Sequence, residues 1–409
     1  MTTRNTAATS VLSRALKSCF MALLALAIVS TAFLAGFATQ RVTSPAASAA
    51  QTTASGNPTA PDFQVFWEAW HILEKEFYGT LPTGQQVAYN AIRGVLATLD
   101  DPNTILVEPV QHEFEKDEFQ GEFGGIGAYV STDEQGRVVI VSPIDDTPAS
   151  RAGLQAGDII LEVEGQEVTG LGQDQAILLI RGPVGTPVTL IVSREGEPDP
   201  LTFTLTREKI ETPTVEQRIL QDDIGYLRIS FFSARTPQEL DRALDKLRDA
   251  GAQKIVLDLR SNPGGLVDSA IATGSQFIAD GVIAYEQTKE GTRRPYKSQR
   301  GGKATGTPLV VLINEGTASA SEIVAGALQD IGRAQLIGAH QSFGKGSVQI
   351  PFDLSDGASL HVTVAHWLTP NGTDLNEQGL TPDIWVKPAE EPQTDPDLDR
   401  AIKFFEEGE

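Results

Sequence analysis

Two serines lie at a predicted junction between a strand and a helix. The apolar run 309–313 is typical of a buried strand and the alanine-rich run 321–329 of a helix, which leaves Ser319 and Ser321 beside the turn. A serine in this place is suited to acyl transfer, because the free N–H groups and positive dipole at a helix N-terminus can stabilise an oxyanion. The structural alternative is that these serines only cap the helix.

A serine nucleophile needs a base, and the strongest candidate is Lys345. The flanking residues Gly344 and Gly346 would let the backbone press the lysine into an apolar pocket. Burial disfavours the charged form of a lysine, and only the neutral form can accept a proton. Taken by itself, the sequence Gly344-Lys345-Gly346 is also typical of an exposed turn. It is not a phosphate-binding loop, because the upstream glycine and the following helix pattern are missing.

Histidines and cysteines offer no alternative motif. None of the five histidines lies in a motif that would direct it toward a serine, so we interpret each as a surface or packing residue. They are His71, His112, His340, His361 and His366. The single cysteine, Cys19, excludes an intramolecular disulfide, and no Cys/His cluster has the spacing of a structural zinc site. We therefore expect neither disulfides nor zinc to hold the fold.

A second informative region spans residues 119–207 and has the pattern of a small β-rich domain. Short β-like runs at 138–141, 159–163 and 188–192 are separated by turns that contain glycine, proline and aspartate. The glycine-rich sequence FGGIGA precedes them at 123–128, and its backbone N–H groups could point outward and capture a carboxylate.

This region resembles a PDZ domain of the circularly permuted type found in proteases. The resemblance is carried by FGGIGA together with PASRAGLQAGD at 148–158 and the sequence VEG at 163–165. It implies that the domain binds the C-terminal end of a peptide by strand addition and carboxylate capture. The carboxylate-binding loop would comprise Gly125, Ile126, Gly127 and Ala128.

The motifs together resemble one family, the C-terminal processing peptidases, also called tail-specific proteases. The resemblance covers residues 62–386. Besides the PDZ pattern it rests on LDLRSNPGG, SASEI, FGKG, TPNG and GLTPD, which begin at residues 257, 319, 343, 369 and 379. It implies a serine–lysine dyad in which Ser319 is the nucleophile, Lys345 is the base and Gln349 orients the lysine.

The resemblance also implies several supporting roles. The N–H of Ala320 and one from Gly264 would form an oxyanion hole. Ser321 would cap the helix, because residues two apart at a helix start point in different directions. Arg181 matches a PDZ position that couples peptide binding to the protease core in some relatives, although a surface salt bridge is an equally good interpretation. No metal or organic cofactor is implied.

Composition excludes one large class of partners. The chain has 409 residues, with 32 Lys and Arg against 54 Asp and Glu, and a formal net charge of −22. Nucleic-acid affinity comes mainly from basic side chains, so nucleic acid is not expected as a partner.

The N-terminal 49 residues differ from the rest, because they contain basic residues but no acidic ones. The run 19–38 is uncharged, mostly apolar and long enough to span a bilayer, and Ala47-Ser48-Ala49 resembles a signal-peptide cleavage site. Either a cleaved signal or a retained membrane anchor would place the acidic body outside the cytoplasm, whether periplasmic, secreted or anchored. A buried soluble helix is the remaining alternative. Residues 50–61 suit a flexible linker.

The expected fold is a multidomain α/β protein. A helical module over 62–118 precedes the PDZ domain, and its aromatic stripe (Phe63 to Phe77) is interpreted as core or as a homodimer contact. Residues 208–388 would form the protease core, which the resemblance implies to be a ββα-repeat fold of the crotonase/ClpP-like kind on which the helical module packs. An acidic tail with a short helix at 398–405 would end the chain at 389–409.

The predicted function is that of a serine endopeptidase that recognises protein C-termini and cleaves near them. The first alternative is a catalytically inactive PDZ adaptor or holdase on a protease-like scaffold. The second is an acyl-CoA enzyme on a related scaffold, which would also use paired oxyanion N–H groups. The PDZ pattern and the serine–lysine pair argue against the acyl-CoA enzyme.

Overall fold

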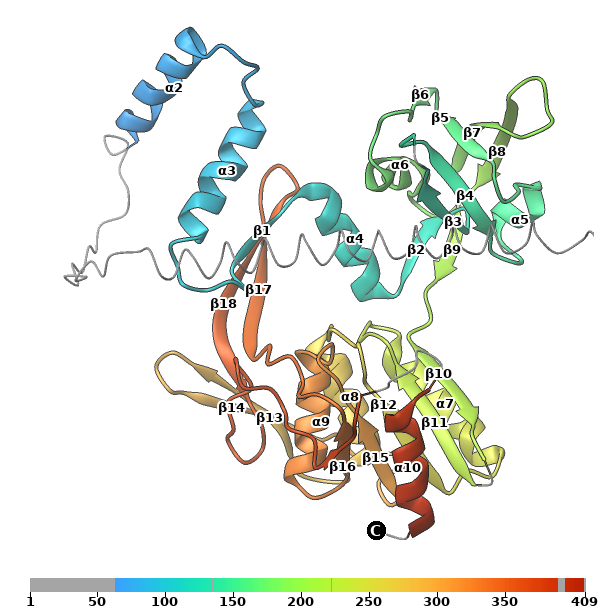
Figure 1. Ribbon diagram of the computed structural model, residues 1–409, viewed down its shortest axis with the longest axis vertical. Helices are drawn as coiled ribbons and strands as arrows, with labels where there is room; N and C mark the ends of the chain where they lie inside the picture. Colours follow the sequence, from blue (N-terminus) through green and yellow to red (C-terminus); the bar gives the residue numbers. More distant parts are fainter. Residues whose placement is uncertain (1–62, 134, 222, 389–393, 408–409) are drawn as a thin grey trace, which may run out of the picture. The chain divides into compact units, whose positions relative to one another are not determined.

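A computed structural model describes residues 63–133, 135–221, 223–388 and 394–407 (Figure 1). The predicted leader, membrane anchor and linker lie outside the described residues. Among the described helices, none is long and apolar enough to cross a membrane. The chain divides into two compact units, and the boundary follows Leu81, inside the expected helical module.

The first unit contains helix α2 (Gln64–Glu76), which confirms the helix predicted from the aromatic spacing. Its aromatic stripe is not a core, however. No residue of α2 is buried, and Phe63, Trp67 and Phe77 are each at least half exposed. The interpretation of this stripe as core was therefore wrong for the described part of this unit, residues 63–81, where no second helix or strand covers it.

The second unit begins with helix α3 (Gly84–Leu96), which a capping box at Thr83 and Gln86 starts. Strand β1 (Ile105–Val107) and helix α4 (Pro109–Gln120) follow. Helix α4 ends at Gly121, whose φ of +72° is the left-handed conformation that glycine adopts without strain. The region predicted as purely helical thus includes a strand that joins a sheet of the core.

The PDZ region folds as predicted, around a six-stranded antiparallel sheet of order β3-β4-β5-β7-β8, with β6 beside β5. Alternate residues of β7 are buried, as expected for a strand with one face on a core. Strands β2 and β9 pair where the chain enters and leaves the domain. The elements are β2 (Glu122–Gly125), β3 (Ala128–Thr132), β4 (Val138–Pro143), α5 (Pro148–Ala152), β5 (Ile159–Val163), β6 (Gln166–Glu167), α6 (Gln173–Ile180), β7 (Pro187–Ser193), β8 (Leu201–Thr206) and β9 (Glu208–Glu211).

The core contains a six-stranded sheet of order β10-β11-β12-β15-β16-β19, in which all neighbours except β10 and β11 are parallel. Side chains alternate between its two faces. Ile255 and Leu257 pack with helices α7, α8 and α9, whereas Val256 packs with α10. The elements are β10 (Val215–Ile219), β11 (Ile224–Ile229), α7 (Thr236–Asp249), β12 (Lys254–Asp258), α8 (Val267–Phe277), β15 (Leu309–Leu312), α9 (Ala320–Asp330), β16 (Gln335–Gly338), β19 (Ile384–Trp385) and α10 (Pro396–Glu407).

A second sheet of five strands carries the segment after the candidate base. Its order is β1-β18-β13-β14, and β17 pairs with β18. Strand β17 begins at Ser347, two residues after Lys345, so this sheet fixes where the lysine segment ends. The elements are β13 (Val282–Thr288), β14 (Arg293–Lys297), β17 (Ser347–Asp353) and β18 (Ser359–Leu368).

The acidic C-terminal region contains the predicted helix, α10, and that helix packs on the core. Ala401 and Phe404 are buried against the strands of the six-stranded sheet. Arg260 binds the carboxylates of Asp258, at 2.6 Å, and Asp395, also at 2.6 Å. The described acidic side chains at the start of this region therefore attach the helix to the core.

Candidate active site

Ser319 lies on the turn between strand β15 and helix α9, where the sequence predicted it. Its φ and ψ are +55° and −118°, a conformation that non-glycine residues rarely adopt and that functional sites tend to retain. The residue is partly exposed. A sharp strand-to-helix turn of this kind presents a serine side chain outward from a rigid sheet.

Ser321 does not cap the helix as expected, because Ser319 occupies the N-cap position of α9. Ser321 is completely buried, and its Oγ donates a hydrogen bond of 2.8 Å to the carbonyl oxygen of Asn262. The structure therefore separates the two candidate serines into a partly exposed one on a strained turn and a buried one with a structural hydrogen bond.

Glu322 joins the serine turn to the lysine segment. Its Oε2 accepts the backbone N–H groups of Ser319, at 2.8 Å, and Lys345, at 2.9 Å. Its Oε1 accepts the Ser342 hydroxyl at 2.6 Å and the Gly344 N–H at 2.7 Å. Burial raises the pKa of this completely buried carboxyl, and the four hydrogen bonds offset part of that rise.

Lys345 is half-buried in a loop that packs against the serine turn. The Phe343 N–H donates to the carbonyl oxygen of Thr317 at 2.9 Å. A Cβ on Gly346 would lie only 2.1 Å from the backbone nitrogen of Asn376, so this position beside the lysine accepts only glycine.

Gln349 lies away from its expected partner in this conformation. Its Nε2 donates to the carbonyl oxygen of Asn103, and the pairing of β17 with β18 shifts by a bulge between Val348 and Gln349. Among the described residues, no hydrogen bond joins Gln349 to Lys345. The expected orienting contact is thus absent from this conformation.

Gly264 lies directly against the serine turn. Its φ is +111°, and an added Cβ would lie 2.8 Å from the Ser319 Cβ and 3.0 Å from the Ala320 nitrogen. Only glycine allows this approach. The Gly264 N–H already donates to Asn262 Oδ1 at 2.9 Å, however, so one of the two expected oxyanion donors has a partner in this conformation.

The expected carboxylate-binding loop lines a groove in the PDZ domain. The groove has a volume of about 430 Å³ and lies between strand β3 and helix α6, with Ile126, Gly127 and Ala128 at the loop and Ile177 and Ile180 on the helix. Among the described backbone hydrogen bonds, none uses the N–H of Ile126 or Gly127. The loop can therefore offer free donors beside an apolar groove.

Arg181 lies at the end of helix α6 and lines the same groove. Its guanidinium binds Asp117 of helix α4 at 2.6 Å and stacks 3.7 Å from the ring centroid of Phe123. Burial raises the pKa of Asp117, although the arginine lowers it in part. Arg181 thus connects the groove to the helix that precedes the domain.

Comparison with known proteins identifies the family. Residues 223–386 match peptidase family S41, and residues 139–194 match the PDZ domain. A carboxy-terminal-processing protease of Bartonella bacilliformis is 41% identical over 315 residues, which cover 76% of this chain and 72% of that protein. The chain belongs to the C-terminal processing peptidases.

Two further relatives are similar to this chain over most of its length. A carboxyl-terminal-processing protease of Synechocystis is 40% identical over 325 residues, which cover 78% of this chain and 75% of that protein. The solved structure of a photosystem II D1 C-terminal processing protease is 31% identical, covering 82% of this chain and 89% of that one, with a TM-score of 0.47. The two family matches and the curated relatives show that this C-terminal processing peptidase is a serine-type peptidase with an inserted PDZ domain, a module that binds peptide or protein substrates.

Several residues that shape the peptidase site were not singled out from the sequence. Glu322 could have been found, because Ser-x-x-Glu before an apolar helix is the pattern of a capping box, in which the glutamate accepts the backbone N–H of the serine. No local sequence pattern marks Asn262 or Asp117. Their hydrogen-bond partners, Ser321 and Arg181, lie far from them in the sequence.

Proposed function

We propose that this peptidase cleaves proteins near their C-termini with Ser319 as nucleophile and Lys345 as general base. The observation that carries the proposal is the strained, partly exposed turn at Ser319, which Glu322 holds beside the lysine segment. The buried hydrogen bond of Ser321 supports the choice between the two serines.

The proposed reaction passes through an acyl-enzyme. Neutral Lys345 takes the proton of the Ser319 hydroxyl as the oxygen attacks the scissile carbonyl carbon. The lysine then gives this proton to the leaving amine as the peptide C–N bond breaks. Water next attacks the ester, the lysine takes a proton from it, and the new C-terminus leaves as Ser319 regains its proton.

The proposed reaction needs the Lys345 amine within hydrogen-bond distance of the Ser319 hydroxyl, a bond that is absent among the described residues, and two further local changes would complete the arrangement. Gln349 would turn from Asn103 toward Lys345, and the Gly264 N–H would exchange Asn262 for the oxyanion, joining the N–H of Ala320. Both hydrogen bonds are single contacts, each worth about 1 kcal/mol net, so substrate binding can supply the change.

The PDZ groove would hold the substrate tail by its terminal carboxylate and an apolar side chain. Retention there raises the effective concentration of the scissile bond at the serine. Arg181 would couple the two sites, since it contacts both the groove and helix α4.

We further propose an extracytoplasmic location, with residues 1–49 as a signal peptide or membrane anchor. The acid-free apolar leader supports this. The exposed aromatic stripe of α2 supports a contact with a second copy of the chain. The parallel sheet with three helices on one face supports the ββα-repeat interpretation of the core, with boundaries at 208 and 388.

Labelling with a fluorophosphonate tests the proposal. The probe should modify the wild-type protein at Ser319, as located by peptide mass spectrometry, and should modify Ser321→Ala equally. Absence of labelling while a C-terminal peptide occupies the PDZ groove would favour the inactive adaptor. Modification at Ser321 would contradict the assignment of the nucleophile.

A further inference from the structure

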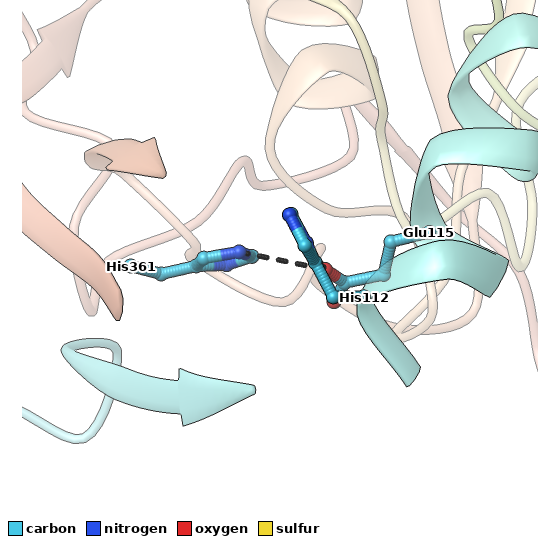
Figure 2. Close-up of side chains that lie close together, drawn as sticks. All are labelled: His112, Glu115 and His361. Atoms are coloured by element: carbon cyan, nitrogen blue, oxygen red, sulfur yellow. Dashed lines mark ion pairs between the residues drawn. The ribbon is translucent and has the colours of Figure 1, made fainter. Parts of the chain in front are cut away.

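Two histidines and a glutamate converge at a place that the proposed reaction does not use. His112 and Glu115 lie on helix α4, three residues apart and therefore on one face, and His361 lies on strand β18 (Figure 2). One ligand atom from each residue lies within 4.8 Å of the others. We call this group the His–Glu cluster.

The three facing atoms of the His–Glu cluster are buried and lack hydrogen bonds. They are His112 Nδ1, Glu115 Oε2 and His361 Nε2. The His112 side chain is only 6% exposed and that of His361 only 13%. A buried polar atom without a partner costs about 1–3 kcal/mol, so three together indicate a missing common partner.

The cluster is poorly explained as an ion pair alone. The Glu115 oxygen lies 3.8 Å from His112 Nδ1 and 3.4 Å from His361 Nε2, without hydrogen-bond geometry. An ion pair therefore leaves all three atoms without a hydrogen bond, whereas one bound cation would satisfy them together.

A second carboxylate fixes the orientation of His112. The Nε2 of His112 lies 2.8 Å from Asp353 Oδ1, which is hydrogen-bond distance. An ionised aspartate can only accept, so Nε2 carries the hydrogen and the lone pair lies on Nδ1, toward the cluster. The same carboxylate–histidine arrangement supports the ligands of many metal sites.

We propose that the His–Glu cluster binds one divalent transition-metal ion, with Zn²⁺ as the best match. Two imidazole nitrogens and one carboxylate oxygen form a ligand set that zinc prefers over magnesium or calcium. Tetrahedral zinc with bonds of about 2.0–2.1 Å needs ligand atoms about 3.3 Å apart. The separations from Glu115 are 3.8 and 3.4 Å and all three ligand atoms lie within 4.8 Å of one another, so side-chain rotations would have to draw them together around the ion.

The His–Glu cluster lies between helix α4 and strand β18, so a bound ion would join these two elements. Helix α4 also carries Asp117, the partner of Arg181 in the PDZ groove, whereas β18 is the central strand between β1 and β17. A metal bound to His112, Glu115 and His361 would therefore fasten the helix that contacts the PDZ domain to a sheet of the core. No zinc motif is visible in the sequence, because His361 lies far along the chain from His112 and Glu115.

Calorimetric titration of the tag-free full chain with Zn²⁺, after treatment with a chelator, tests the proposal. The wild type should bind one equivalent, and Glu115→Gln and His361→Gln should abolish that binding. Asp353→Asn removes no ligand and should weaken affinity by about 10- to 100-fold. His366→Gln is the matched control, because His366 lies on the same strand but pairs with Asp374 outside the cluster.

A second measurement distinguishes the loss of a metal ligand from misfolding of the variant. Saturating Zn²⁺ should raise the Tm of the wild type and of His366→Gln, but not that of Glu115→Gln, while circular dichroism verifies that each variant is folded. Failure of the wild type to bind Zn²⁺, Co²⁺ or Ni²⁺ would overturn the proposal. Equal zinc binding by folded Glu115→Gln and the control would also overturn it.

Discussion

Ser319 and Lys345 donate their backbone N–H groups to the same oxygen atom, Oε2 of Glu322. The two residues lie on separate segments, one at the start of α9 and the other just before β17. A single buried carboxylate therefore sets the spacing between the proposed nucleophile and the proposed base. Neither side chain has to contact the other for this relationship to hold.

Substitution of Glu322 by glutamine should lower kcat by at least about tenfold. The amide is isosteric, but its NH₂ group cannot accept, so either one or two of the N–H donors loses a buried partner at a cost of about 1–3 kcal/mol. The KM for a substrate with an apolar C-terminus should change little, because the PDZ groove is lined by other residues. Steady-state cleavage kinetics measure both constants.

The matched control for this prediction is Glu315→Gln, which changes an exposed glutamate on the same turn. It should leave both constants unchanged. A wild-type kcat in folded Glu322→Gln would show that the shared carboxylate does not position the two segments.

The ion pair between Asp117 and Arg181 should couple peptide binding to cleavage. Asp117→Asn leaves Arg181 in the groove but weakens its attachment to helix α4. We expect kcat/KM for an unstructured protein to fall about tenfold, which corresponds to about 1.4 kcal/mol, while the Kd for a C-terminal peptide stays within about twofold. Fluorescence anisotropy and cleavage assays provide the two values, and Glu113→Gln, on the exposed face of α4, is the control.

A parallel loss of peptide affinity and kcat/KM in Asp117→Asn would contradict this coupling. The C-terminally amidated peptide is a second control, because it removes the carboxylate that the free N–H groups near Gly127 are proposed to bind. It should bind at least about tenfold more weakly to both proteins.

The PDZ domain should lose stability in acid because of Asp158. This carboxylate is completely buried, and Arg194 binds it at 2.7 Å. Burial by itself raises the pKa of Asp158, but the hydrogen bonds from Arg194 and the Gln155 N–H outweigh it and hold the pKa below its usual value. The stabilisation is therefore complete above the unfolded-state pKa of about 3.9 and is lost as the pH falls through the folded-state value.

Asp158→Asn should lower the free energy of unfolding of this domain by about 3 kcal/mol at neutral pH and should flatten its acid dependence. Pulse hydrogen exchange of β5 and β7 in urea, after equilibration at about pH 7 and about pH 3, measures both effects. Asp145→Asn, at an exposed position of the domain, is the control. An unchanged acid dependence in Asp158→Asn would rule out this carboxylate as its source.

Local patterns predicted much of the fold. Strand β5 has the predicted bounds, Ile159–Val163, and the strand-to-helix junction at Ser319 lies where the apolar and alanine-rich runs meet. These features depend on side-chain periodicity within one segment, which the sequence carries directly.

Contacts between distant segments could not be predicted in the same way. The bulge before Gln349 shifts the register of β17. The Gln349 side chain then donates a hydrogen bond to Asn103 instead of Lys345. The meeting of His112 with His361 depends on how helix α4 lies against β18, so each histidine looked like an isolated packing residue. Sheet register and helix docking are set by the whole fold, and short patterns do not encode them.

The central claim is that Ser319 is the nucleophile, and cleavage of an unstructured protein with an apolar C-terminus by two serine variants tests it most directly. Ser319→Ala should lose at least about a thousandfold in kcat and remain folded. Ser321→Ala loses only a buried hydrogen bond of about 1 kcal/mol and should keep cleavage within about tenfold of wild type. Substantial cleavage by Ser319→Ala, together with its loss in folded Ser321→Ala, would contradict the account.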